Sequence, residues 1–428
     1  MFSFKTLIIL FIVAEALAIL WGGKRRPQIA IIAVILTVGL GYRTVQVTDY
    51  LRLHPAELLL WAAFIIIFIT RTHSDRLRSF FWLPTWVSSF IPFWLIAWLP
   101  GFVAGRSVSL MLSEFKNFLV LIPLFFVAEA ALKDEKVLRS AILAFFAVGV
   151  WIGCMGLLER FFPAVTSAIP GFAAAPSYGT ATIEGFNRAT FSFFGATVAT
   201  FVLVLTIPMT HILWRWYPRH RPLILFALLA QIAGVYIGGY RSMWLTLVIQ
   251  STLWVLMSFG PVPGAFGLLP LSFAASLLLP QMVLDRMYTL VLVIQGQAID
   301  SSSVMRIARL SDAWATVLRQ PLGIGWAGIG WVHSDFIQIF ANLGFIAGML
   351  FIAAWIFTLL RLGRRFLALR SGGRSGALEV SLLLSMIGAG GILWSQGVQV
   401  LLQLILPVWV VWVLAEIWLR QSSEKISH

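Results

Sequence analysis

Two strongly apolar segments of the chain are separated by the polar stretch SSSVMRIARLSDAWATVLRQPLGIGWAGIGWVHSDFIQ, which covers residues 301–338. Most of it falls in a predicted loop, residues 284–333, that contains Arg306, Arg309 and His333. Loops longer than about 12–15 residues are uncommon in compact domains and are usually functional. We therefore expect the chemistry of the protein to lie in this loop, and the rest of the chain to hold it against a bilayer surface.

The composition of the whole chain indicates a lipid environment. Of its 428 residues, 60% are hydrophobic and 11% are charged, whereas a soluble domain has about 45–50% and about 25%. Its apolar runs have the length of roughly 17–25 residues that a helix needs to cross a bilayer. We predict an all-α polytopic membrane protein with about 12–14 transmembrane helices and one domain over residues 1–428. The predicted spans are 6–21, 27–42, 55–70, 80–100, 108–132, 137–158, 189–213, 222–239, 242–258, 263–283, 334–360, 378–394 and 399–418.

Loop charges predict the orientation of these helices. Of the 31 Lys and Arg residues, 19 fall in loops on one side, and this excess marks the cytoplasmic side. The opposite loops hold 10 cations, all of them Arg, and include the two long loops 159–188 and 284–333, which we place outside. The loop cations that orient the helices thus account for the net charge of +14. No basic stretch is interleaved with exposed aromatics, so we expect no nucleic-acid partner.

A histidine and a polar stripe stand at the end of the long loop. His333 precedes Ser334, which can cap a helix. Its imidazole could accept a proton from a sugar hydroxyl, or could serve only as an interfacial anchor. Asp335, Gln338 and Asn342 follow at helical spacing and form one polar stripe on an apolar helix. Such a stripe either makes hydrogen bonds between helices or contacts substrate.

Several outer arginines are candidates for phosphate binding. Arg241 follows the tight turn Gly238-Gly239-Tyr240, and Arg188 opens another apolar segment in a similar position. A guanidinium grips phosphate with two parallel hydrogen bonds and stays charged near a membrane. With Arg306 and Arg309, these residues could hold a diphosphate. The alternative is that they extend from the helix ends into the interface as anchors.

Metal and nucleotide chemistry has no motif in the sequence, since HExxH, GxxxxGK[ST], GxSxG and acidic clusters are all missing. The one cysteine, Cys154, lies in an apolar run, which excludes a disulfide and a thiolate metal site. We therefore expect no metal and no cofactor. Glu114 and Lys116 could relay protons in a transporter, but we expect a neutralised or paired structural role for them.

The motifs resemble those of the O-antigen ligase/O-antigen polymerase superfamily of bacterial membrane glycosyltransferases. The resemblance is strongest over residues 234–357, a core that includes the loop 284–333. It rests on GYRS (239–242), SVMR (303–306), PLGIG (321–325), HSDFIQ (333–338) and NLGFIAG (342–348). Arg188 before an apolar segment also fits the pattern.

This resemblance implies a GT-C-like helical bundle in the bacterial inner membrane, with its active site in a large periplasmic loop. Members of the superfamily take a glycan from undecaprenyl diphosphate, without metal or nucleotide, and pass it to a hydroxyl. The acceptor is lipid A core for a ligase and a growing polysaccharide for a polymerase, and both readings stay open. Together with the residue pattern, the resemblance predicts two groups of site residues, catalytic His333, Arg306 and Arg241, and substrate-binding Arg188, Arg309, Asp335 and Gln338.

Two other classes of function are compatible with a polytopic chain. A multi-spanning transporter or flippase for lipid-linked oligosaccharides would carry charged residues deep in several helices and matched broken helices in two halves. A purely structural assembly protein would need no arginines and histidine gathered on one face. The gathered cations favour the transferase.

Overall fold

The structure is a computed structural model of the 428-residue chain, and it describes most of the residues. The described residues are 4–22, 25–39, 45–46, 52–70, 83–132, 134–168, 182–183, 186–187, 191, 195–260, 262–264, 266, 285, 288, 292, 295, 301–330, 332, 334–373, 375–395 and 402–424.

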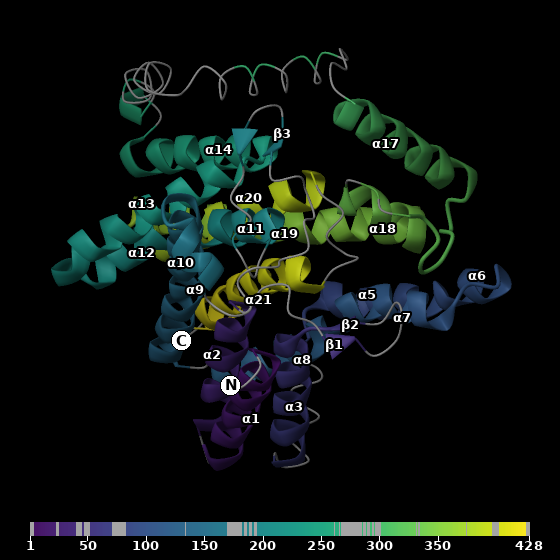
Figure 1. The fold of residues 1–428 in the computed structure, drawn as a ribbon, viewed down its shortest axis with the longest axis horizontal. Helices are drawn as coiled ribbons and strands as arrows, with labels where there is room; N and C mark the ends of the chain where they lie inside the picture. Colours follow the sequence, from purple (N-terminus) through teal and green to yellow (C-terminus); the bar gives the residue numbers. More distant parts are fainter. Residues whose placement is uncertain are drawn as a thin grey trace.

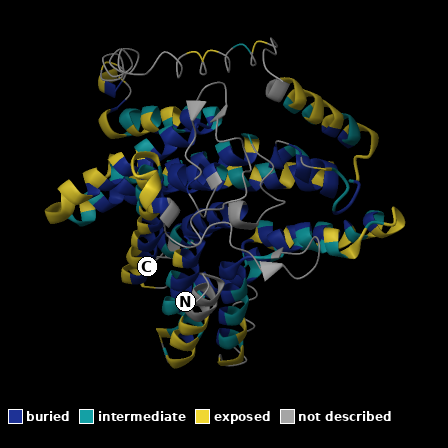
Figure 2. Cartoon of the chain, in the orientation of Figure 1, coloured by how far each residue is buried: buried dark blue, intermediate teal, exposed yellow. Residues whose placement is uncertain are grey.

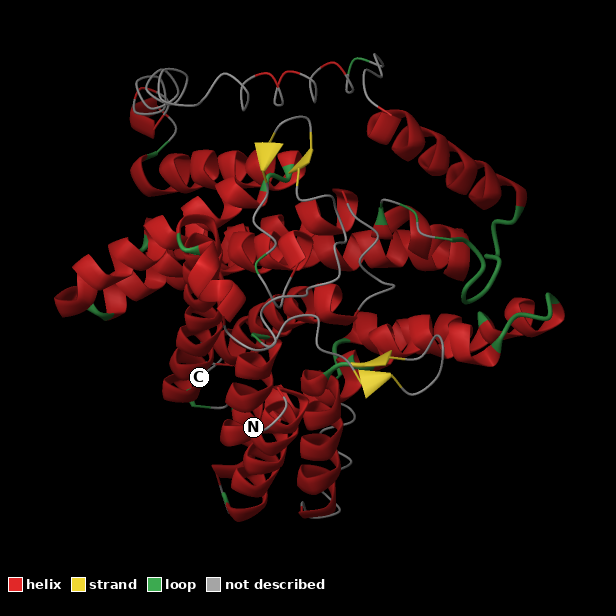
Figure 3. Cartoon of the chain, in the orientation of Figure 1, coloured by secondary structure: helices red, strands yellow, loops and turns green. Residues whose placement is uncertain are grey.

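Within this part the chain is almost entirely helical (Figure 3). The helices of the first half are α1 (Phe4–Trp21), α2 (Arg26–Val38), α3 (Pro55–Thr70), α5 (Thr85–Ile96), α6 (Trp98–Val103), α7 (Val108–Leu119), α8 (Leu121–Ala131), α9 (Glu135–Phe161) and α10 (Pro163–Ala168). Two short antiparallel hairpins pair β1 (Val45–Gln46) with β2 (Arg52–Leu53), and β3 (Thr182–Ile183) with β4 (Phe186–Asn187).

The second half of the chain contains the segments with most of the predicted site residues. Its helices are α11 (Gly195–Thr206), α12 (Met209–Trp216), the 3-10 turn η2 (Pro218–His220), α13 (Arg221–Gly238), α14 (Arg241–Phe259), α17 (Ser301–Arg319), α18 (Asp335–Leu343), α19 (Phe345–Ser371), α20 (Ala377–Ser395) and α21 (Leu402–Glu424).

Helices α20 and α21 form the centre of the molecule (Figure 1). Helix α20 packs against α11, α12, α14, α19 and α21, and Figure 2 shows both central helices mostly buried. Helix α9 runs along α13, and α2 packs against α3, α8 and α9. The central helices are apolar on nearly all sides because neighbouring helices surround them.

The protein is a multi-pass membrane protein by the length and apolarity of its helices. In the described part, eight helical segments can cross a bilayer, or nine if the bent pair α11–α12 counts as one span. Helices α2 and α3 are apolar but shorter. The predicted span 263–283 lies almost wholly outside the described residues, so the larger predicted number of spans stays a prediction.

Proline and glycine divide several predicted spans. The pair α11–α12 bends by 46° next to Pro208, which cannot donate a helical hydrogen bond. The span predicted over 334–360 is divided at Gly344, whose φ of +94° is left-handed and ends α18. A single membrane helix there was therefore a wrong prediction. The polar stripe lies instead on the separate nine-residue helix α18, about 14 Å long and too short to cross a bilayer.

The predicted loop 284–333 contains a long helix that the sequence analysis missed. Residues 301–319 form α17, which has no glycine or proline inside it and ends just before Pro321. The polar composition suggested a loop, but a helix needs only one apolar side when it packs on the surface of a bundle.

Candidate functional site

Helix α17 is anchored on α18 by one apolar side. Ala313 and Val317 are buried on that side, and the Trp314 ring meets Phe340 edge to face at 6.1 Å. Arg306 is half-buried and lies on the same side, since it precedes Ala313 and Val317 by seven and eleven residues. Arg309 is exposed. Of these two predicted site residues, only Arg306 is partly buried.

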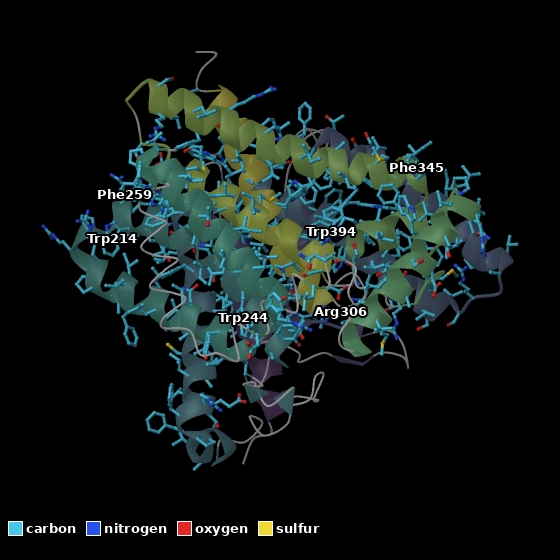
Figure 4. All side chains as sticks on the ribbon, turned by 90° about the horizontal axis from the view of Figure 1, so that it is seen from above. Trp214, Trp244, Phe259, Arg306, Phe345 and Trp394 are labelled. Atoms are coloured by element: carbon cyan, nitrogen blue, oxygen red, sulfur yellow. The ribbon has the colours of Figure 1, made fainter. Side chains whose placement is uncertain are left out.

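Figure 4 shows Arg306 in the same region of its view as Trp244, in the first turn of α14, and Trp394, at the end of α20. The Trp394 ring is 6.2 Å from that of Phe336, in the first turn of α18. The inner side of α17 therefore faces the N-terminal end of α18, where the polar stripe begins.

The turn that joins α17 to α18 is built on two glycines. Gly323 and Gly325 have φ of +90° and +85°, which side chains rarely adopt. A Cβ on Gly323 would lie 2.5 Å from the backbone nitrogen of Gly344, and one on Gly325 would lie 2.5 Å from the Ala97 carbonyl oxygen. The glycines of the PLGIG motif are therefore needed because the backbone of this turn lies against the backbone of Gly344 and Ala97.

Backbone hydrogen bonds hold this turn in place. The N–H groups of Ile324 and Gly325 donate to the carbonyls of Ala341 and Asn342 at 2.8 and 2.9 Å. The Trp326 N–H donates to the Ala97 carbonyl at 3.0 Å, at the break between α5 and α6. The turn is therefore inserted between α18 and the α5–α6 junction.

Arg106 clamps the same turn. Its Nη1 donates to the carbonyls of Ile324, Gly325 and Trp326 at 2.7, 3.2 and 2.9 Å. Burial lowers the pKa of the Arg106 guanidinium and the Glu114 carboxylate opposes this shift, so the group stays charged. Arg106 therefore has a structural role in the turn, beyond an interfacial anchor.

Glu114 of α7 joins the turn to the stripe. Its side chain is 6% exposed, and its Oε2 accepts from the Ala327 N–H at 2.8 Å and from Asn342 Nδ2 at 3.0 Å. Glu114 and Lys116 do not pair with each other, because Lys116 binds Glu57 at 2.9 Å instead. Residues two apart on a helix point in nearly opposite directions, so Glu114 and Lys116 have different partners.

The polar stripe of α18 is deeply buried. Asp335 and Gln338 are 0% exposed, and Ser334 and Asn342 are each 2% exposed. The other side of the helix carries Phe336, which contacts aromatic rings of α19 and α20. The predicted stripe is thus confirmed as an inward-facing row of polar side chains.

Several polar atoms of this row have no protein partner in the described part of the chain. They are Ser334 Oγ, both polar side-chain atoms of Gln338, and Asn342 Oδ1. A buried polar atom without a partner costs about 1–3 kcal/mol. A row of such atoms along one helix therefore indicates a place where a polar ligand is bound.

Arg241 is the first residue of α14 and is half-buried. Gly239 ends α13 with φ of +69°, and the hydroxyls of Tyr240 and Thr197 are hydrogen-bonded to each other. The Trp244 indole donates to the Val235 carbonyl at 3.0 Å. These contacts fix the short connection that the sequence predicted, and they place Arg241 at a defined position at the end of two helices.

His333 and Arg188 lie outside the described residues, so their predicted roles stay predictions. The neighbours Val332 and Ser334 of His333 are both buried, at the start of α18. Sequence reasoning missed Arg106 and Glu114 as parts of the site. Glu114 carried a signal, because an ionisable residue within a membrane segment marks a functional site by default.

The arrangement combines a cationic side with a neutral polar side. Arg306 and Arg241 can bind an anionic group, and the amides and hydroxyl of α18 can bind hydroxyl groups. Among the residues with described placement, no three His, Cys, Asp or Glu side chains are grouped to bind a metal ion.

No family model matches the chain, and no curated sequence is significantly similar to it. The resemblance to the ligase and polymerase superfamily thus rests on the motifs alone.

Proposed function

We propose that the protein transfers a glycan from undecaprenyl diphosphate to an acceptor hydroxyl at the periplasmic face of the bacterial inner membrane. It would act as an O-antigen ligase or polysaccharide polymerase of the GT-C type. One observation carries this proposal: the half-buried Arg306 is on the side of α17 that packs on α18, and α18 carries a buried, partly unpartnered polar row. A phosphate-binding cation next to a hydroxyl-binding row is what such a transfer needs.

The proposed reaction moves one glycosyl group. The acceptor oxygen bonds to the anomeric carbon of the donor, and the bond from that carbon to the diphosphate oxygen breaks. The hydroxyl proton passes to His333, and the lipid diphosphate leaves with its charge held by Arg306 and Arg241. Fixed guanidinium groups stabilise charge that develops on a leaving group, and diphosphate needs no strong acid to depart.

The remaining predicted residues bind the two substrates. Arg188 and Arg309 would contact donor phosphates, and Asp335 and Gln338 would contact acceptor hydroxyls. Helix α17 also supports a position at the bilayer surface, because Ile307, Trp314 and Leu318 share one exposed side.

Transfer by the purified protein in detergent, with a lipid-linked donor, tests the assignment of roles. His333→Ala should cut turnover by about 10²–10⁴-fold while donor binding stays the same, because it removes only the base. Arg306→Ala should weaken donor binding. Arg319→Ala is the control on the exposed part of the same helix. If His333→Ala transfers at the parent rate, the base lies elsewhere, and Asp335 becomes the candidate.

Ligase and polymerase differ only in the acceptor. A deletion strain separates them on a gel of surface polysaccharide. Loss of all long chains from lipid A supports a ligase, and retention of a single repeat unit supports a polymerase. Normal lipopolysaccharide with a missing capsule or exopolysaccharide supports a polymerase of that other polymer.

A flippase for lipid-linked oligosaccharide is the second candidate, and two features favour it. The Glu57–Lys116 ion pair is buried within the helical bundle, and α11–α12 is a broken apolar pair. Proteoliposomes with a labelled lipid-linked oligosaccharide would distinguish the two functions. Movement of the label across the bilayer without glycan transfer, abolished by Lys116→Met, would replace the transferase proposal.

A further inference from the structure

The polar row of α18 ends at a carboxylate from a distant part of the chain. One oxygen of Glu114 accepts hydrogen bonds from Ala327, in the turn after α17, and from Asn342, at the end of the row. These donors are 213 and 228 residues away from Glu114 in sequence. A single atom of α7 therefore connects the two segments that flank His333.

This contact also decides how the Asn342 amide is oriented. Asn342 Nδ2 donates to Glu114 Oε2 at 3.0 Å, so the NH₂ group of Asn342 points toward Glu114. Its Oδ1 then points away from Glu114, and it has no partner in the described residues. Asn342 thus offers an acceptor to the same row in which Gln338 offers both a donor and an acceptor.

The groups of the row limit what can bind there. Glu114 lies at its far end, and the side chains with unpartnered atoms are one hydroxyl and two amides, all of them neutral. Carboxylates disfavour phosphate or carboxylate ligands, and amides pair well with hydroxyls. The row therefore fits a neutral sugar with several hydroxyls.

We infer that Glu114 is a positioning residue, which seats the 321–327 turn and orients Asn342 so that the row binds the hydroxyls of a neutral acceptor sugar. This inference rests on the proposed transferase function and deepens it. Glu114 acts through Asn342 and the turn, and it takes no part in bond making. Arg106 holds the same turn through hydrogen bonds to the carbonyls of Ile324, Gly325 and Trp326.

Hydrogen–deuterium exchange of the purified protein tests, without any substrate, whether Glu114 holds the 321–327 turn in place. In Glu114→Leu, the amides of residues 324–327 should exchange at least about tenfold faster than in the parent, because the buried hydrogen bond from Ala327 is lost. Glu114→Gln keeps an acceptor oxygen for Ala327 and should retain protection there. Unchanged exchange in Glu114→Leu would overturn the inference, whatever the activity of the parent.

Transfer kinetics test the orientation of Asn342. Glu114→Leu should raise the acceptor KM by at least about tenfold and leave donor binding unchanged. A matched control is Glu379→Gln, because Glu379 is also buried and accepts two side-chain hydrogen bonds, from Arg365 and Trp418. Arg365 lies about 30 Å along α19 from its start near α18, so this control should leave the acceptor KM unchanged.

Exchanging the carboxyl and the amide between Glu114 and Asn342 tests whether the loss of transfer comes from lost positioning or from lost folding. Asn342→Asp places a second carboxyl against Glu114, so transfer should fall as the pH rises and the pair loses its shared proton. Adding Glu114→Gln supplies an NH₂ donor to the new carboxylate and should restore transfer and remove the pH dependence. No rescue in a double variant that remains folded would overturn the inference. Absence of transfer by the parent would instead overturn the proposed function and the sugar assignment, and the exchange result would stand by itself.

Discussion

Replacing Gln338 by leucine should stabilise the protein and impair glycan transfer at the same time. Gln338 is 0% exposed, and both polar atoms of its side chain lack a partner within the described chain. Each such atom costs about 1–3 kcal/mol, so the lower limit gives a gain of about 2 kcal/mol when both are removed. At about 2 °C per kcal/mol for a large domain, the melting temperature should rise by roughly 4 °C.

Gln250→Leu is the matched control for this change. Gln250 is also buried and its Oε1 likewise has no partner in the described residues, but its Nε2 donates to the carbonyls of Val204 and Leu384 at 2.9 and 2.8 Å. The same substitution there should lower stability by about 1–3 kcal/mol, since two hydrogen bonds are lost. The two glutamines differ in the partners of Nε2, so the comparison isolates the effect of the missing Nε2 partners at Gln338 from the effect of the substitution itself.

Thermal unfolding in detergent and acceptor kinetics together decide the outcome. We expect Gln338→Leu to melt higher than the parent and to show a raised acceptor KM. A melting temperature lowered as much as in Gln250→Leu would show that the Gln338 amide is satisfied inside the protein. Unchanged acceptor kinetics would remove Gln338 from the acceptor site.

Three further predictions test other parts of the structure. Gly325→Ala should destabilise the turn by about 1–3 kcal/mol, because a Cβ there is strained and meets the α5–α6 backbone; Gly330→Ala, whose Cβ would meet nothing within 4 Å, should have little effect on thermal unfolding. Arg241→Lys should impair transfer despite the retained charge, since the planar fork is lost; full activity in Arg241→Ala with normal expression would show that the residue only anchors α14. Reporter fusions at residues 305 and 370 should be active outside and inside the cell respectively, as the Lys and Arg distribution predicts; cytoplasmic activity at 305 would contradict a periplasmic site.

The sequence by itself determined the class of protein and many of its helices. The predicted span 55–70 matches α3, and the predictions 137–158, 222–239 and 378–394 match α9, α13 and α20 to within three residues. The polar row on α18 was predicted from spacing alone. These features are local, because apolar length and helical periodicity are properties of one segment and need no partner to be recognised.

Tertiary structure alone decided how the site is held together. Nothing near Glu114 in sequence indicates Ala327 or Asn342 as its partners, and Lys116, two residues away, binds Glu57. The break at Gly344 likewise depends on the turn, because a Cβ there would lie 2.7 Å from the Leu322 carbonyl. The physical reason is that a buried polar group takes whichever partner the packed helices bring within about 3 Å, and sequence distance does not constrain that choice.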